Sequence, residues 1–282
     1  MIEVILKGGL GNQMFEYSAA RHLGIKYNKN LVLNTEYFSN IPKGDVPRKY
    51  QLDIFHIDKN IKLKETVNPI FRIIQKIVLK FSNKFFGEKA QIVFSKLMLR
   101  LDLPVYLNGY FQNEKYFKDD RDILIKEFTL TKKIGEEAKR LKGILEKSEG
   151  VCLNVRRGDY LRPDYIKIFG VLGMEYYQEA LKQISDKVKN PLFCVFSDDP
   201  EWVKKEFKID NVIFAGTDIL KDYEQMYLMS LCKHNIIANS SFAWWGAWLN
   251  QNPNKIVIAP KQWAANRTSD DLDILPTGWI KI

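Results

Sequence analysis

The sequence predicts an α/β protein with two domains. Short apolar runs typical of buried strands alternate with segments of helical periodicity, an order that produces parallel sheets covered by helices on both faces. The chain has 282 residues, which is enough for two domains of ordinary size. Its hydrophobic content of 46% is typical of a packed globular protein and excludes a disordered chain. We expect the boundary near residues 148–150, which gives domains of residues 1–149 and 150–282.

The N-terminal domain is predicted to begin with a β-α-β unit. Residues 2–7 form a buried apolar strand, a glycine-rich turn follows, and apolar residues then recur at helical spacing as far as Leu23. Residues 31–33 and 105–111 are predicted as further strands, and residues 134–147 as a helix with one polar face.

A basic helical insertion is expected in this domain at about residues 60–103. Nine Lys and Arg side chains but only two Glu side chains occur between Lys62 and Arg100. Apolar residues between positions 70 and 85 recur at helical spacing, with basic residues along the other side. Such a helix can lie on an anionic membrane surface, or it can pack on the protein core and expose its basic face to solvent. Both interpretations stay open.

The C-terminal domain is predicted to be a regular alternation of strands and helices. The strands are expected at residues 151–155, 192–196, 212–214, 235–238 and 256–259. The helices are expected at residues 176–188, 202–207, 223–232 and 242–249. Ligands of open α/β sheets bind beyond the carboxyl ends of the strands. Four polar clusters follow predicted strands, and they are the candidate sites.

The first cluster follows the strand at 151–155 and contains Arg156, Arg157, Gly158 and Asp159. Arginine presents a rigid fork of donors that matches phosphate or carboxylate oxygens, so this cluster predicts an anion site. The structural alternative is an Arg–Asp pair that only shapes a turn.

The second cluster follows the strand at 192–196 and contains Ser197, Asp198, Asp199 and Pro200. A carboxylate here can accept hydrogen bonds from a purine edge or from ribose hydroxyls, and the two together can bind a divalent cation beside a diphosphate. Because Asp-Pro is typical of a helix start, we expect one aspartate to be an N-cap and the other to be available to a ligand.

The third cluster runs through Asn239, Ser240, Ser241 and Phe242 into a helix that carries three tryptophans. Backbone N–H groups at a helix start, together with two hydroxyls, can bind an anion, and a serine at this place can also cap the helix. Gly246, which lies among the tryptophans, indicates a close approach of neighbouring structure.

The fourth cluster lies between the first strand and the first helix and contains Gly11, Asn12 and Gln13. It lacks the glycine pattern of a dinucleotide site and the lysine of a P-loop. Its side-chain amides can nevertheless reach a polar ligand.

No zinc site is predicted, because none of the three histidines is spaced with Cys or Glu like one, and no other cofactor is expected. The three cysteines stand alone in apolar runs, which is typical of reduced thiols in an intracellular protein. No apolar run approaches the ~20 residues that span a bilayer, and the first residues lack the apolar core of a secretory signal. We therefore expect a cytoplasmic protein. Its net charge of +9, from 43 basic and 34 acidic residues, indicates anionic partners.

Taken together, the clusters resemble the bacterial α-1,2-fucosyltransferases of glycosyltransferase family 11, on the segments GGLGNQMFEYSAARHLG, NVRRGDY, FSDDPEWV and NSSFAWWGAWLN. The resemblance spans nearly the whole chain except residues 40–103. It implies two Rossmann-like domains facing a cleft (the GT-B type), GDP-fucose as the donor substrate, inversion at the anomeric carbon, and no metal. One position differs: Asn154 stands where the arginine motif of the family often begins with His, which argues against proton transfer there.

The resemblance also suggests roles for the clusters. Departure of GDP concentrates negative charge on the β-phosphate, and fixed donors that stabilise this charge are the largest available catalytic effect. The expected phosphate ligands are Arg156, supported by Arg157, and the helix start with Asn239, Ser240, Ser241 and Phe242. The expected guanine or ribose ligands are Ser197 and Asp198. The expected contacts to fucose and acceptor are Gly11, Asn12 and Gln13. Asp159 either deprotonates the acceptor hydroxyl or orients the arginines, and both roles stay open.

The expected function is transfer of L-fucose from GDP-fucose to the 2-hydroxyl of a galactose-terminated glycan. The alternatives are a transferase that uses another GDP-sugar such as GDP-mannose, a non-catalytic nucleotide-sugar binder, and a nucleic-acid binder. The last is disfavoured, because residues 70–85 present Ile and Phe rather than a groove of base-stacking aromatics. The expected partners are GDP-fucose and a glycan, which can be lipid-linked, with peripheral contact at the inner face of an anionic membrane.

Overall fold

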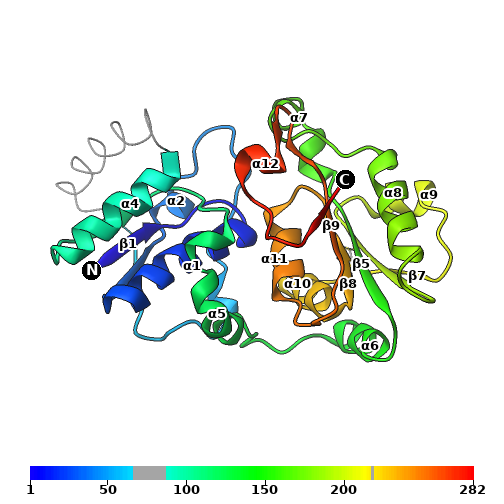
Figure 1. Ribbon diagram of the computed structural model, residues 1–282, viewed down its shortest axis with the longest axis horizontal. Coiled ribbons are helices and arrows are strands. Elements are labelled where there is room, and N and C mark those ends of the chain that lie inside the picture. The colour runs from blue at the N-terminus through cyan, green and yellow to red at the C-terminus, as the bar shows by residue number, and fades with distance from the viewer. Residues whose placement is uncertain (66–86, 217–218) are drawn as a thin grey trace. The chain divides into compact units, whose positions relative to one another are not determined.

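The structure, a computed structural model, describes residues 1–65, 87–216 and 219–282 of the chain (Figure 1). The chain divides into two compact units, Met1–Lys132 and Lys133–Ile282, and each contains a parallel sheet with helices, as predicted. The division lies earlier than the boundary expected near 148–150. The cause is helix α6 (Glu136–Leu145), whose buried Ala138, Leu141 and Leu145 pack into the same apolar cluster as residues of the second unit.

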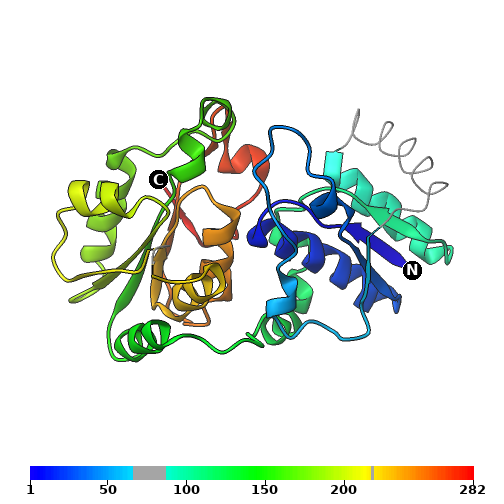
Figure 2. The same ribbon diagram turned by 180° about the vertical axis from the view of Figure 1, so that it is seen from behind.

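The first unit is built on a four-stranded parallel sheet in the order β3-β2-β1-β4 (Figure 2 gives the view from behind). The strands are β1 (Ile2–Ile5), β2 (Leu31–Asn34), β3 (Lys62–Lys64) and β4 (Val105–Leu107). The helices are α1 (Leu10–Tyr27), α2 (Glu36–Ser39), α4 (Gly87–Arg100) and α5 (Arg121–Glu127), with short 3-10 turns at Leu52–Ile54, Glu114–Tyr116 and Lys118–Asp120. The predicted β-α-β start is confirmed.

Helix α1 is the central element of this unit. Met14, Phe15 and Leu23 are fully buried on it, and most of its other residues are buried as well, so the helix is covered on most of its sides. The helix ends at Asn28, whose backbone lies in the left-handed region (φ 49°) and whose N–H donates to the carbonyls of the last turn.

The basic insertion expected at about residues 60–103 is described only in part. Residues 62–64 form the edge strand β3 rather than a helix, and residues 87–100 form helix α4 as expected. The amphipathic helix expected between positions 70 and 85 lies outside the described residues.

The second unit is built on a six-stranded parallel sheet in the order β12-β9-β8-β5-β6-β7. The strands are β5 (Gly150–Val155), β6 (Leu192–Ser197), β7 (Val212–Phe214), β8 (His234–Ile236), β9 (Val257–Ala259) and β12 (Ile280–Lys281), and a separate hairpin is formed by β10 (Gln262–Ala264) and β11 (Arg267–Thr268). Besides α6, the helices are α7 (Pro163–Phe169), α8 (Met174–Ser185), α9 (Pro200–Glu206), α10 (Asp222–Leu231), α11 (Ser241–Leu249) and α12 (Ser269–Leu272), with a 3-10 turn at Gly158–Leu161. The strands and helices predicted for this region are confirmed to within a few residues.

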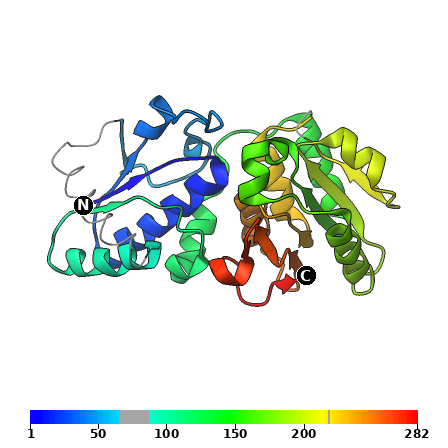
Figure 3. The same ribbon diagram turned by 90° about the horizontal axis from the view of Figure 1, so that it is seen from above.

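The two faces of this sheet are buried under different helices, as Figure 3 shows. Val151 and Leu153 of β5 pack with Tyr177 and other residues of α8, whereas Cys152, between them in sequence, packs with residues of α6 and α10 such as Leu141. Alternate residues of a strand point to opposite faces, so a strand buried on both sides is apolar throughout.

The tryptophans of α11 belong to the core. Trp244, Trp245 and Trp248 are at most 2% exposed, and the indole N–H of Trp244 donates to the carbonyl of Ile274 at 2.9 Å. The close approach predicted at Gly246 is confirmed: a Cβ on this residue would lie 2.7 Å from the Cβ of Met229 on α10. None of the described helices is both long and apolar enough to cross a membrane.

Each sheet has one point at which the direction of strand addition reverses. In the first unit the chain adds β2 and β3 on one side of β1 and then β4 on the other. In the second unit it adds β6 and β7 on one side of β5, and then β8, β9 and β12 on the other. Beyond the carboxyl ends of the strands at such a switch point, open α/β sheets bind their ligands.

Candidate functional site

Three of the four predicted clusters lie together at the carboxyl edge of the second sheet. They follow β6, β5 and β8, which are neighbours in this sheet. Tyr160, in the loop after β5, donates its hydroxyl hydrogen to the backbone carbonyl of Asn239 after β8 at 3.1 Å. This hydrogen bond spans the switch point between β5 and β8.

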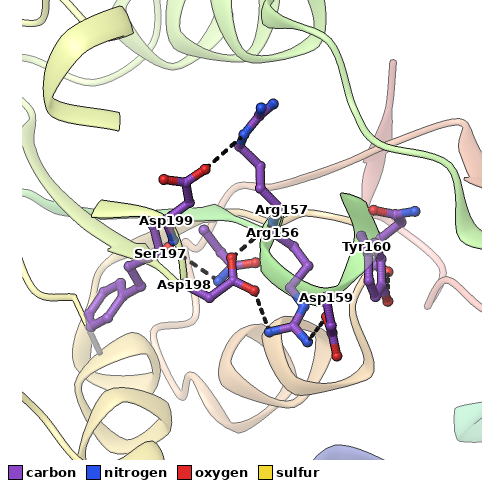
Figure 4. A network of polar contacts seen from close by, with 10 residues as sticks. Arg156, Arg157, Asp159, Tyr160, Ser197, Asp198 and Asp199 are labelled. Carbon is purple, nitrogen blue, oxygen red and sulfur yellow. Dashed lines mark hydrogen bonds and ion pairs between the residues drawn. The ribbon is translucent and has the colours of Figure 1, made fainter. Parts of the chain in front are cut away.

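Arg156 is held between two carboxylates, one from its own loop and one from the loop after β6 (Figure 4). Its Nη1 lies 2.7 Å from Oδ2 of Asp198, and its Nη2 donates to Oδ1 of Asp159. Its guanidinium carbon also lies 5.2 Å from the ring centre of Tyr160. The side chain remains 26% exposed, so a ligand can reach the guanidinium.

Arg157 points away from Arg156, as Figure 4 shows. Its Nε lies 3.3 Å from Oδ2 of Asp199, and its guanidinium carbon lies 3.8 Å from the ring centre of Trp202 on α9. The structure therefore places the two arginines in different surroundings. In this conformation Arg157 does not reach the position from which Arg156 would contact a phosphate.

One of the two aspartates after β6 caps a helix, as predicted, whereas the other is engaged by the arginine loop. Asp199 is the N-cap of α9 and accepts a hydrogen bond from the N–H of Trp202 at 3.2 Å, which confirms that one aspartate caps the helix. The expectation that the other is available to a ligand is not met. Asp198 accepts from the backbone N–H of Arg157 at 2.9 Å and pairs with Arg156.

The other residues of these two loops fix the arrangement. Ser197 is 4% exposed, and its hydroxyl accepts a hydrogen bond from the N–H of Asp199 at 3.0 Å, so it shapes the turn rather than facing a ligand. A Cβ on Gly158 would lie 2.4 Å from Oδ2 of Asp198. A glycine is therefore needed where the arginine loop passes this carboxylate.

The start of α11 presents backbone N–H groups at the switch point. Ser240 occupies the N-cap position, yet its side chain makes no capping hydrogen bond. Ser241 and Phe242 lie in the first turn and are half-buried. Unsatisfied N–H groups of a first turn form a site for anionic oxygens.

The side-chain nitrogen of Asn239 is hydrogen-bonded within the second unit, whereas its side-chain oxygen has no hydrogen-bond partner. Its amide nitrogen donates to the carbonyls of Phe169 at 2.9 Å and Trp263 at 3.1 Å. Its side-chain oxygen is buried without a hydrogen-bond partner. Because buried polar atoms are normally paired, this oxygen is a candidate acceptor for a ligand donor.

The fourth cluster lies at the switch point of the first unit, between β1 and β4. Gln13 is fully buried: its amide donates to the carbonyls of Gly8 and Lys49, and its oxygen accepts from the N–H of Gln51. This corrects the prediction that Gln13 reaches a ligand, because its hydrogen-bonding groups hold the loop at 49–51. Gly11 is also buried, in the first turn of α1.

Asn12 keeps a position from which it can meet a ligand. It is half-buried, and its Oδ1 accepts from Nε2 of Gln112, after β4, at 2.8 Å. Gly8, at φ 70°, makes the turn before it, and a Cβ on Gly8 would lie 2.6 Å from Nδ2 of Asn12. A hydrogen bond therefore spans this switch point, as one does in the second unit.

Sequence reasoning missed the charged groups beside this turn. Nζ of Lys7 lies 3.1 Å from Oδ1 of Asn108, after β4. One oxygen of Glu16 accepts from the N–H of Lys7, and the other is buried without a partner. Burial raises the pKa of the Glu16 carboxyl well above its usual value. The strand expected at 105–111 ends at Leu107, and this overestimate hid Asn108 as a loop residue.

The described residues form no candidate metal site, and their cysteines are buried thiols. In residues 1–65, 87–216 and 219–282, no group of three or more His, Cys, Asp or Glu side chains is placed to hold a metal ion. Cys152, Cys194 and Cys232 are unpaired and buried, as predicted. Burial raises the pKa of the Cys194 thiol to about 12.

Comparisons with known proteins agree over the whole chain. A family model described as "Glycosyl transferase family 11" matches residues 1–282. An O-antigen biosynthesis glycosyltransferase of Escherichia coli, WbnK, is 33% identical over 300 residues, covering 98% of this chain and 99% of the relative. An alpha-1,2-colitosyltransferase of Escherichia coli is 33% identical over 291 residues, covering 98% and 97%. A galactoside 2-alpha-L-fucosyltransferase of Mus musculus, Sec1, is 28% identical over 264 residues, covering 88% of this chain and 64% of the relative.

Solved structures support the fold. A mutant of Arabidopsis thaliana FUT1 in complex with GDP has a TM-score of 0.51 at 11% identity, covering 99% of this chain and 75% of that chain. The fucosyltransferase NodZ from Bradyrhizobium has a TM-score of 0.50 at 10% identity, covering 87% and 92%.

The two units have the GT-B fold, and the family model that matches the whole chain identifies the protein as a glycosyltransferase. The chain belongs to glycosyltransferase family 11.

Proposed function

We propose that this enzyme transfers L-fucose from GDP-fucose to the 2-hydroxyl of a galactose-terminated glycan, with inversion and without a metal ion. The observation that carries the proposal is Arg156, a partly exposed guanidinium at the switch point of a parallel sheet, beside the uncapped start of α11. Relatives named as an α-1,2-colitosyltransferase and as a galactoside 2-α-L-fucosyltransferase support both the linkage and the type of sugar.

The chemistry follows from this arrangement. The acceptor oxygen forms a bond to the anomeric carbon while the bond from that carbon to the β-phosphate oxygen breaks. The bonding electrons stay on the phosphate, and the hydroxyl proton goes to a base. Arg156 and the N–H groups of α11 would stabilise the phosphate charge as it develops. Asp159 already pairs with Arg156, and this contact supports its role in orienting the guanidinium.

A donor and acceptor panel tests the proposal. The enzyme would be incubated with GDP-fucose and a set of galactose-terminated glycans, with GDP release measured and the product linkage determined by NMR. We expect GDP release only with an acceptor, and an α-1,2 linkage. GDP binding by calorimetry without turnover on any acceptor would instead identify a non-catalytic binder.

Transfer of colitose is the second candidate, because one relative at 33% identity is named for it. Colitose is fucose that lacks the 3-hydroxyl group. A site that hydrogen-bonds this hydroxyl discriminates by about 10⁴-fold or more, whereas a purely apolar pocket does not. Comparison of kcat/KM for GDP-fucose, GDP-colitose and GDP-mannose therefore identifies the donor.

The acceptor that we propose is a lipid-linked glycan of the O-antigen type, at the cytoplasmic face of the inner membrane. The support is the relative WbnK, which is named for O-antigen biosynthesis and matches over nearly its full length. Purified glycan intermediates with and without the lipid carrier would be compared as acceptors, and we expect transfer to both.

A further inference from the structure

Helix α4 has one face that is fully engaged with the first unit. Ile92 and Leu99 are buried, and the Gln91 amide donates to the carbonyl of Asn108 and accepts from its N–H. The carboxylate of Glu88 accepts from the backbone N–H groups of Tyr110 at 2.6 Å and Phe111 at 3.0 Å. The inner face of α4 is therefore fixed to β4 and to the loop that follows it.

The outer face of α4 is apolar along one line. Val93 is 68% exposed, Leu97 53% and Leu101, just past the helix end, 61%, and these residues are four positions apart. At 100° per residue they form one stripe, with the 40% exposed Phe94 beside it. Leu103, in the turn that follows, is 41% exposed. Single exposed apolar side chains are ordinary, but a contiguous stripe indicates an interaction surface.

A row of cations lies beside this stripe. Lys89, Lys96 and Arg100 occupy helix positions about 20° to 60° from Val93, on the side away from Phe94. The carboxylate of Glu88, the one acidic residue within α4, is turned inward to the loop after β4. The nearby Asp102 pairs with Lys29. The outer face of α4 therefore combines exposed apolar side chains with positive charge.

We propose that this face of α4 docks on an anionic lipid surface. An amphipathic helix binds such a surface by burying its apolar side chains at the headgroup level while its Lys and Arg side chains meet lipid phosphates. A protein partner fits less well, because lysine is depleted in protein interfaces and two of the three cations here are lysines. The inference goes beyond the transfer reaction and does not depend on the donor or acceptor.

Vesicle co-sedimentation tests the docking. The full chain would be mixed with vesicles of phosphatidylcholine alone and of phosphatidylcholine with phosphatidylglycerol. Two double variants remove the two parts of the surface, V93S/L97S and K96Q/R100Q. Matched controls are I123S, an exposed apolar residue on α5, and K139Q/R140Q on α6. All of these side chains are partly or fully exposed, so melting temperatures should match that of the unsubstituted enzyme.

We expect the unsubstituted enzyme and both controls to sediment with the anionic vesicles and much less with the neutral ones. Each α4 variant should bind the anionic vesicles about tenfold less. Equal, negligible sedimentation with both vesicle types would overturn the proposal, and so would α4 variants that bind as well as the controls. Self-association that V93S/L97S abolishes, without vesicle binding, would assign the face to a second copy of the chain instead.

Discussion

The guanidinium of Arg156 is the group on which the proposed reaction depends most directly. In R156A the β-phosphate would lose one fixed donor, so we expect turnover to fall about 10²-fold or more, with the circular dichroism spectrum unchanged. Steady-state GDP release measures the effect. R140A is the matched control, because Arg140 pairs with Glu137 on the exposed side of α6. Near-normal turnover in R156A would show that Arg156 does not stabilise the departing phosphate.

Gly158 provides a subtler test of the same loop. Its alanine variant would place a Cβ 2.4 Å from Oδ2 of Asp198, so the carboxylate must move and carry Arg156 with it. Because a displacement of about 1 Å in a positioning group can cost on the order of 10²-fold in rate, we expect a loss of that size in kcat. A G158A enzyme with unchanged kcat would show that the Asp198–Arg156 pair is dispensable.

At the level of single residues, the sequence predicted the type of role, such as anion binding or helix capping, better than it predicted which residues contact each other. An anion site at Arg156 and a cap at one of two aspartates follow from residue type and position alone. Which aspartate caps, and that Asp198 is taken up by Arg156, depends on the pairing of β5 with β6 across 41 residues of chain. Gln13 was misjudged because its partners at 49–51 lie in a loop that no pattern connects to it.

Among the elements, helices α10 and α11 approach each other closely at a glycine, Gly246. G246A would force a Cβ to 2.7 Å from that of Met229, and overpacking of this kind costs about 1–3 kcal/mol of unfolding free energy. The same substitution at Gly143 in α6 meets no atom within 4 Å, and there we expect a gain of about 0.5–1 kcal/mol. Urea unfolding of the two variants measures both. The same sign of change in both would contradict the packing explanation.

Strand β8 introduces a pH dependence through His234. Its Nδ1 accepts from the N–H of Ile256 at 3.0 Å, and burial lowers the pKa of the imidazole below its usual value. The unfolded chain therefore binds a proton more readily, so this contribution to stability is full above pH ~6.5 and is lost as the pH falls toward the folded-state pKa. Urea unfolding between pH 5 and 8 should show the decline, and H234N should lessen it. An identical pH profile in H234N would assign the decline to other groups.

Most elements could be predicted because their apolar patterns are local. Strands β5 and β6 are largely apolar runs, and α8 has a clear apolar stripe. The two-residue strand β12 and the edge strand β3 could not be predicted. Strands this short show no hydrophobic periodicity, and their pairing partners lie far away in the sequence. The predicted boundary lies too late in the chain, because the apolar side of α6 does not show to which of the two cores the helix belongs.

For the molecule as a whole, the metal-free mechanism makes a direct prediction. If Arg156 and the start of α11 stabilise the leaving diphosphate, excess EDTA should leave GDP release unchanged. Added Mg²⁺ should give no more than a small change, by pairing with the free donor. Loss of turnover on chelation, restored by a divalent cation, would contradict the metal-free mechanism and would indicate Asp198 and Asp199 as the candidate metal ligands.

The way in which the arginine loop balances its own charge affects inhibition. Arg156 contacts Asp159 and Asp198, and Arg157 contacts Asp199, so three carboxylates surround two guanidiniums. A small anion such as inorganic phosphate must compete with these internal counter-ions using electrostatic attraction alone. A nucleotide brings further contacts through its base and ribose. Buffer phosphate should therefore inhibit this enzyme only weakly, whereas the GDP product should be an effective competitor of the donor.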